Sequence, residues 1–558
     1  SGGQNVAIGY LALSLETTSA NNVAIGREAL KTSNGGSGNT AVGRTALSAT
    51  TTGDDNTGLG LSALTANTTG ASNVAIGALA LDANTTAAEN TAVGTSAMSA
   101  NTTGASNAAL GTDALKLNTT GASNTALGAY SLDANTTAAN NTAVGVHSLG
   151  ANTTGGQNTA FGAEALKANT TASHNTAIGR HALLTNITGS GLTAVGHQAL
   201  NSNTTGTDNV AVGGFSTASS VFAPLYANTT GASNVGIGVG ALRTNTTASN
   251  NTAVGKRALT ANTTGDNNVG VGALALDANT TGRFNVASGV DALRRSTTGS
   301  TNTAVGYAAL EDNTTASDNT AYGAYALSGN TTGTFNVAVG SEAMLTNTTG
   351  DQNVAMGYEA LEANTTADGN TALGMRALKA NTTGENNIAV GVQTLLSNTT
   401  GSENTAVGRN ALVSNTTAAN NTAVGTFALT ANTTGSNNTA VGSLAGDAVT
   451  TGTSNVAVGR AAFTTATTGA SNVAVGVSAL EAATTSSFNT CVGGNAGSSV
   501  TTGANNLFLG RTAGITGSPG GNFVTASNAI VLGDENISEA NIQVDWTVAS
   551  DARDKTDF

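Results

Sequence analysis

The chain is built on a short pattern of apolar and polar positions that recurs every 17 residues. A unit reads Asn, Thr or Val, Ala, Val or Ile, Gly, two variable residues, Ala, Leu, two variable residues, Asn-Thr-Thr-Gly and two more variable residues; Asn404 to Asn420 is representative. β-Branched residues alternate with small ones as in a strand, and 17 residues are too few for a pair of helices. The pattern predicts an all-β fold, an elongated parallel β-roll or β-solenoid with one coil per unit.

The units form two long runs. Thirteen units precede a single insertion and seventeen follow it. The predicted organisation is a repeat shaft at 1–213, a corner insertion at 214–227, a continued shaft at 228–510, a C-terminal cap at 511–545 and a junction at 546–558.

Two positions of the unit are nearly invariant along the chain. The fifth is Gly in all 30 units, which predicts a backbone with positive φ or a contact too close for a Cβ atom; examples are Gly43, Gly77, Gly306 and Gly408. The twelfth is mostly Asn, whose amides can pair from coil to coil as a ladder; examples are Asn67, Asn84, Asn262 and Asn381.

The remaining pattern predicts two strands per unit and a thin core. The first strand covers the Asn-Thr-Ala-Val segment, and the second covers Ala-Leu and runs toward Asn-Thr-Thr. Two aliphatic ladders are expected to hold the coils together, at the fourth position (Val42, Ile76, Val93) and the ninth (Leu47, Leu64, Leu81). Cys491 at a third position, and Met98 and Met344 at ninth positions, are expected to be core substitutes.

Composition supports a thin object and excludes several classes of protein. Charged residues are 9% and aromatic residues 3%, whereas a typical domain has about 25% charged residues. The formal charge of −13 argues against nucleic acid, which requires a basic face. Gly, Asn or Thr interrupts every apolar stretch, so no membrane-spanning segment is expected.

No constellation of residues predicts catalysis, a metal site or a cofactor. The four histidines fall at unrelated repeat positions without ligand spacing, and no inward-facing carboxylate pair suggests a depolymerase. The Asn-Thr-Thr elements are formal N-glycosylation sequons, but their spacing is that of the coil. Adjacent Thr residues should point to opposite faces of a strand, which disfavours a flat ice-binding array. We therefore expect no enzyme and no cofactor.

The insertion concentrates aromatic residues in a chain that has few. It contains Phe215, Phe222 and Tyr226. One interpretation is a corner loop packed on the shaft, and the other is a small knob that contacts a receptor.

The C-terminal segment carries the most specific motif. Ser550-Asp551-Ala552-Arg553-Asp554-Lys555 resembles the junction at which trimeric phage tailspikes and tail fibres meet their C-terminal intramolecular chaperone, of the endosialidase type. The resemblance implies trimer assembly followed by self-cleavage beside Ser550, with Ser550 and Lys555 as the reacting groups. Without the rest of the chaperone these two residues form no complete catalytic site.

The repeats are also similar to the left-handed β-roll heads of trimeric autotransporter adhesins, whose units carry a related Ser/Asn-Val-Ala-Ile-Gly strand. Together the resemblances imply a homotrimeric structural shaft of a phage tail fibre or tailspike that contributes to host attachment, with a host surface glycan or receptor as partner. The alternative is a bacterial surface adhesin or extracellular filament. The expected location is the virion or the cell exterior.

Overall fold

The computed structural model describes residues 3–214 and 222–539, and these divide into two compact units at Asn336 and Val337. The described residues contain no helix, and every strand is three residues long. The strands of unit 1 are β1 (Val6–Ile8), β2 (Val23–Ile25), β3 (Thr40–Val42), β4 (Thr57–Leu59), β5 (Val74–Ile76), β6 (Thr91–Val93), β7 (Ala108–Leu110), β8 (Thr125–Leu127), β9 (Thr142–Val144), β10 (Thr159–Phe161), β11 (Thr176–Ile178), β12 (Thr193–Val195), β13 (Val210–Val212), β14 (Val235–Ile237), β15 (Thr252–Val254), β16 (Val269–Val271), β17 (Val286–Ser288), β18 (Thr303–Val305) and β19 (Thr320–Tyr322). Those of unit 2 are β20 (Val337–Val339), β21 (Val354–Met356), β22 (Thr371–Leu373), β23 (Ile388–Val390), β24 (Thr405–Val407), β25 (Thr422–Val424), β26 (Thr439–Val441), β27 (Val456–Val458), β28 (Val473–Val475), β29 (Thr490–Val492), β30 (Leu507–Leu509) and β31 (Ile530–Leu532).

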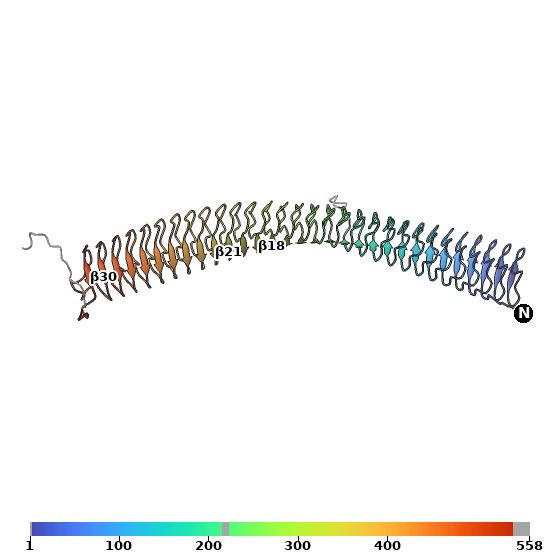
Figure 1. The fold of residues 1–558 in the computed structure, drawn as a ribbon, viewed down its shortest axis with the longest axis horizontal. Helices are drawn as coiled ribbons and strands as arrows, with labels where there is room; N and C mark the ends of the chain where they lie inside the picture. The colour runs from blue at the N-terminus through green and yellow to red at the C-terminus, as the bar shows by residue number, and fades with distance from the viewer. Residues whose placement is uncertain (1–2, 215–221, 540–558) are drawn as a thin grey trace, which may run out of the picture. The chain divides into compact units, whose positions relative to one another are not determined.

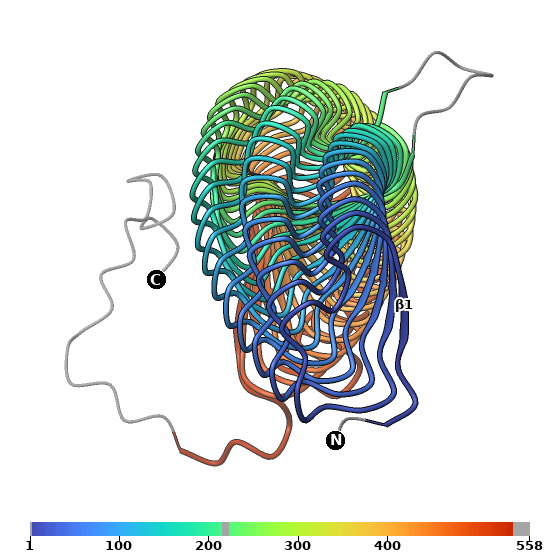
Figure 2. The ribbon, with the colours of Figure 1, turned by 90° about the vertical axis from the view of Figure 1, so that its right-hand side faces the viewer.

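Within each unit the strands form a parallel ladder in which like positions stack. Ala160 in β10 lies opposite Ala177 in β11, and Val407 in β24 lies opposite Val424 in β25, each pair 17 residues apart. The strands follow one another along each unit in Figure 1, and Figure 2 shows successive coils of unit 1, in blue and green, lying one behind the other. The predicted parallel β-solenoid with a 17-residue coil is confirmed.

Most strands turn a small third-position residue inward, whereas β30 and β31 bury Phe508 and Val531 there. The third-position alanines, such as Ala41 and Ala75, are fully buried, as are Leu47 and Leu64 at the ninth position. A Cβ added to Gly58, a third-position glycine, would lie 3.2 Å from the Cγ atom of Leu47. The space between the strand and the leucine ladder therefore holds only a methyl group.

The fourth position consequently faces outward: the predicted aliphatic ladder forms, with Val42 opposite Leu59 and Ile76 opposite Val93, but it lies on the surface and not in the core. Ile76 is 36% exposed, and Val42 and Val93 are half-buried. Side chains alternate along a strand, so burying the third position exposes the second and the fourth. The ninth-position ladder and the core substitutes Cys491, Met98 and Met344 are buried as predicted.

The predicted second strand is absent from the described coils, where a turn occupies its place. In the coil that begins at Asn39, Thr45 and Leu47 have φ values of 59° and 53°. A left-handed residue costs roughly 1–2 kcal/mol, but burying a leucine side chain contributes about 1.5–3 kcal/mol. The turn also bonds to its neighbour, since the amide of Leu47 donates to the carbonyl of Ala63 at 2.9 Å. Burial and hydrogen bonding together offset the conformational cost.

The fifth-position glycines satisfy both predicted requirements. Gly43, Gly77, Gly306 and Gly408 have φ values of 139°, 137°, 137° and 129°. A Cβ on Gly408 would lie 2.6 Å from the carbonyl oxygen of Gly425 in the next coil. Any larger residue here would be strained and would also push two coils apart.

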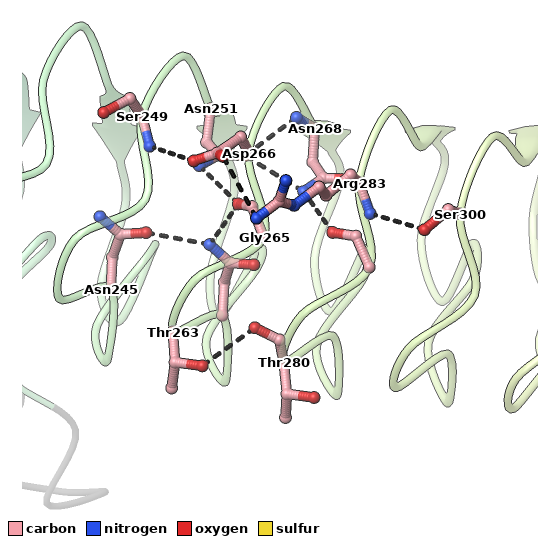
Figure 3. Close-up of polar contacts among 12 residues, drawn as sticks. Asn245, Ser249, Asn251, Thr263, Gly265, Asp266, Asn268, Thr280, Arg283 and Ser300 are labelled. Carbon is pink, nitrogen blue, oxygen red and sulfur yellow. Dashed lines mark hydrogen bonds and ion pairs between the residues drawn. The ribbon is translucent and has the colours of Figure 1, made fainter.

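Two buried Asn ladders run beside each other through the coils, at the first and the twelfth positions. At the twelfth, the Nδ2 of Asn262 donates to the Oδ1 of Asn245 and to the carbonyl of Gly265, both at 2.9 Å. At the first, the Nδ2 of Asn251 donates to that same carbonyl at 2.9 Å, as Figure 3 shows. Both ladders are thus tied to one backbone oxygen in each such coil, which satisfies polar groups that would be costly to bury unpaired.

The ladder residues singled out from the sequence take this arrangement. Asn84 donates its Nδ2 to the Oδ1 of Asn67 at 2.9 Å, and Asn381 donates to the Oδ1 of Asn364 at 3.2 Å. Asn67, Asn84, Asn262 and Asn381 are all fully buried. Their amides are therefore inaccessible in the folded coil, which supports the structural interpretation of the sequons.

Candidate functional site: the outward strand face

The outward face of the strands is a continuous stripe of half-exposed apolar side chains. At the fourth position of unit 1, Leu110, Phe161 and Tyr322 are 47%, 56% and 47% exposed. In β1–β19 this position is hydrophobic in every strand except β17, where it is Ser288. In β20–β31 it is hydrophobic throughout. We call the second- and fourth-position side chains of the described strands the outward stripe.

The outward stripe carries no charged residue in any of the described strands. Its second position is mostly Thr or Val, which suits a pleated, half-buried surface. Charges lie instead on the turns and at the corners that precede the strands, as Asp55 and Asp318 do. Arg376 contacts Glu359 at 2.7 Å and Arg257 contacts Asp277 at 2.9 Å, all four at seventh or tenth positions. The stripe is therefore both apolar and neutral, while the net charge of the chain lies elsewhere.

One shallow hollow interrupts the stripe of unit 1. Ala108 stands at the second position of β7, where most neighbouring strands carry Thr or Val. The missing side-chain atoms leave a depression of 270 Å³ lined mainly by β6, β7 and β8, including Val93, Leu110 and Leu127. It can accept an apolar side chain from another molecule.

The aromatic insertion packs partly on the coil. The rings of Phe222 and Tyr226 lie 4.7 Å apart, and the guanidinium of Arg243 lies 5.9 Å from the Phe222 ring. Phe222 is 36% exposed, whereas Leu225 takes a buried ninth position. Phe215 lies outside the described residues. The two described aromatics thus pack against each other, and Phe222 is partly exposed.

One acidic side chain on the turns has a strongly perturbed pKa. Hydrogen bonds from Lys379, Tyr358 and Arg376 lower the pKa of Glu359 to about 2. This carboxylate lies on the turn face rather than on the outward stripe. The cluster is an ion-pair network that links successive coils, since Arg376 lies 17 residues after Glu359.

Tenth-position aspartates show the opposite shift. Burial raises the pKa of Asp82, Asp133, Asp277 and Asp447 above the usual value for aspartate. One carboxylate oxygen each of Asp82, Asp277 and Asp447 is buried without a hydrogen-bond partner. These carboxylates therefore cost stability when ionised.

Cysteine and histidine side chains are spread through the coils. Burial raises the pKa of the Cys491 thiol to about 12, so the thiol is inert. His147 stacks on Tyr130 at 5.0 Å, and His181 lies 3.5 Å from Glu164. Within residues 3–214 and 222–539, no three His, Cys, Asp or Glu side chains gather as a metal site would require. A search of the same residues finds no helix of membrane-spanning length and hydropathy.

The sequence identified the coil but not its exposed surface. The alternation of a short strand does not say which face is inward, so the outward exposure of the apolar fourth position was not predicted. Ser550 and Lys555, the residues implied by the chaperone resemblance, lie outside the described residues. No protein-family profile matches the chain, and no curated protein matches it.

Proposed function

We propose that this chain is a structural fibre protein, the shaft of a phage tail fibre or tailspike, and that it contributes to attachment to a host cell. The observation that carries the proposal is the stack of near-identical coils with a neutral apolar stripe along each unit. Such stacking builds an extended surface from a short repeat. The sequence resemblances to tail-fibre and adhesin repeats agree with this role. A catalytic role for the shaft is not part of the proposal.

The fourth-position column of the outward stripe is where copies of the chain would meet. Exposed contiguous apolar surface of this kind marks protein–protein interfaces. Each chain carries a formal charge of −13, so two copies repel each other unless the surfaces in contact are neutral. The stripe meets that condition because none of its positions carries a charged residue in the described strands. We propose a homotrimer, the state that both sequence resemblances imply.

The interface is tested by placing a charge on the stripe. Val424 is 36% exposed at a fourth position of unit 2, so Val424→Lys should leave the coil folded. Light scattering should give three times the 54.0 kDa chain mass for the unchanged protein and a smaller mass for the variant. Thr426→Lys, on the exposed turn two residues away, is the matched control and should keep the larger mass. A single-chain mass for the unchanged protein would overturn the oligomer.

The alternative function is a bacterial surface adhesin or filament built from the same solenoid, which the adhesin-head resemblance favours. The two differ in where the protein is found. Antibodies against the chain, detected with gold particles, should label the tails of phage particles if the first proposal is right. Labelling of bacterial envelopes in cultures free of phage would favour the adhesin instead.

A further inference from the structure

The corner that precedes each strand has a pattern of its own. The seventeenth-position residue lies in the left-handed region, for example Ser72, Asn140 and Asn505 at φ values of 58°, 61° and 57°. In the described coils this residue is polar or Gly with three exceptions, all phenylalanine. Phe284, Phe335 and Phe488 are 57%, 58% and 64% exposed.

These phenylalanines are unfavourable for folding on two counts. Left-handed backbone disfavours bulky residues and suits Asn, Asp or Gly, yet Phe488 has a φ of 61°. Ring burial could offset that cost, as it does for the ninth-position leucines, but the ring is mostly in water. Stability does not explain why a ring stands here, so a contact with another molecule is the better explanation.

Phe488 forms one wall of a hollow in unit 2. The hollow measures 370 Å³ and its lining includes Phe488, Thr490, Asn505, Leu507, Asn528 and Ile530, from the corners and second positions of β29–β31. That volume lies within the range of about 300–1,000 Å³ usual for small-molecule sites. No charged side chain is in the lining. The site therefore suits a neutral ligand.

Two amides stand beside the ring. The Nδ2 of Asn505 donates to the Oδ1 of Asn528 at 2.8 Å, and both residues are exposed. This bond fixes the planes of both amides and leaves the Oδ1 of Asn505 as an acceptor and the Nδ2 of Asn528 as a donor. Asn506 has a different role, because its Nδ2 donates to Asn489 and to the Ala526 carbonyl within the buried ladder.

We propose that this hollow, the Phe488 groove, binds a neutral saccharide. The C–H face of a sugar ring is attracted to the electron-rich face of an aromatic ring. Hydroxyls at the edge of the sugar both donate and accept, which matches the Asn505 oxygen, the Asn528 amino group and the Thr490 hydroxyl. An anionic sugar gains no partner in this lining and is repelled by a chain of net charge −13.

A related corner in unit 1 repeats part of this arrangement, but it carries a carboxylate and is therefore not a second neutral site. Phe284 is followed one coil later by Thr301 and two coils later by Asp318. The Oγ1 of Thr301 donates to the Oδ1 of Asp318 at 2.5 Å. An exposed ring followed by two polar side chains that bond to each other thus occurs twice in the described corners.

The proposal rests on the attachment role proposed above, for which it names the ligand class, but it uses the second-position side of the outward stripe and not the fourth-position column. The groove lies at the corner and second position of each strand. The fourth-position column, where copies of the chain are proposed to meet, lies at the opposite end of the same three-residue strands. Saccharide binding and oligomer formation can therefore be tested separately.

The decisive variant is Phe488→Asn, which installs the residue already present at Asn505 and Asn528. Because Asn favours this backbone, the melting temperature should stay the same or rise. Binding is measured with a printed array of neutral and sialylated oligosaccharides, followed by calorimetry with the neutral oligosaccharide that gives the strongest signal. We expect neutral binding to fall at least tenfold in Phe488→Asn. Phe335→Asn, which removes an equally exposed ring elsewhere, should bind as the unchanged protein does.

Three results would overturn the groove: no binding of neutral sugars, a preference for sialylated ones, or equal binding by Phe488→Asn. Light scattering on the same samples tests the proposed trimer separately from saccharide binding. Saccharide binding by a protein of single-chain mass would overturn the trimer and leave the groove intact. A trimer that ignores every sugar would overturn the groove alone.

Discussion

At the scale of single residues, the coil depends on side chains that have a partner in the next coil. Ser296 shows what happens where the partner fails. It replaces Asn in the twelfth-position ladder, and both its Oγ and the Oδ1 of Asn279 are buried without a hydrogen bond. The serine side chain is too short to reach the amide of Asn279 in the preceding coil. The same orphaned oxygen appears at Asn432, which is followed in the ladder by Val449.

Ser296→Asn should therefore stabilise the protein. The new amide can donate to the Oδ1 of Asn279, and satisfying a buried polar group is worth about 1–3 kcal/mol. The urea midpoint of unfolding should rise. Thr298→Asn, at an exposed position two residues on, is the control and should change little. An unchanged midpoint for Ser296→Asn would show that the ladder contributes no net stability.

Gly306→Val should have the opposite effect. Gly306 has a φ of 137°, and a Cβ there would lie 2.6 Å from the carbonyl carbon of Gly323. Backbone strain alone costs about 1–3 kcal/mol, and the clash adds to it. A clear drop in melting temperature is expected by circular dichroism. Tyr307→Val, at the exposed next residue, should melt close to the unchanged protein, and equal melting of both variants would refute the close approach.

At the scale of one coil, the sequence predicted the period, the glycine corner and the Asn ladder, but not the turn that replaces the second strand. The Ala-Leu segment alternates like a strand, and nothing in its letters shows that Leu47 takes a φ of 53°. That conformation arises because leucine gains more from burial than the backbone loses. The outward exposure of the apolar fourth position was missed for a related reason: only the assembled coil shows that a methyl group fills the space inside.

The turn carboxylates should give individual coils opposite responses to pH. Burial raises the folded-state pKa of Asp447. The loss of folding stability caused by its ionisation is therefore absent below the unfolded-state pKa of about 3.9 and grows as the pH rises through the raised pKa. Hydrogen bonds lower the folded-state pKa of Glu359 to about 2. The stability that this carboxylate contributes is therefore present above pH about 4.3, its unfolded-state pKa, and is lost as the pH falls toward 2.

Asp447→Asn should therefore raise the urea midpoint at pH 7 and leave it unchanged at pH 3. Glu359→Gln should lower the midpoint at pH 7, with a smaller effect near pH 2. Urea titrations at several pH values measure both. A stabilising effect of Asp447→Asn that persists at pH 3 would mean that ionisation is not its cause.

At the scale of the whole molecule, the surface is divided among functions by position in the repeat. Charges lie on the turns and corners, apolar side chains on the outward stripe, and three exposed rings at the corner before a strand. The repeat can be recognised from the sequence because it is periodic. The candidate sites, however, lie where a residue departs from the repeat, as Ala108 and Phe488 do. Only the structure shows which surface of the coil each such residue changes.

The in-register stacking of the coils has a mechanical consequence. Within a unit, every coil is bonded to the coils before and after it by the same set of contacts, so a unit stretched from its ends should release coils singly. Each release frees 17 residues, about 56–61 Å of new contour length at roughly 3.3–3.6 Å per residue. Single-molecule force spectroscopy should record a regular sawtooth of that spacing with peaks of similar height. The repeat would then extend under tension in steps of equal length.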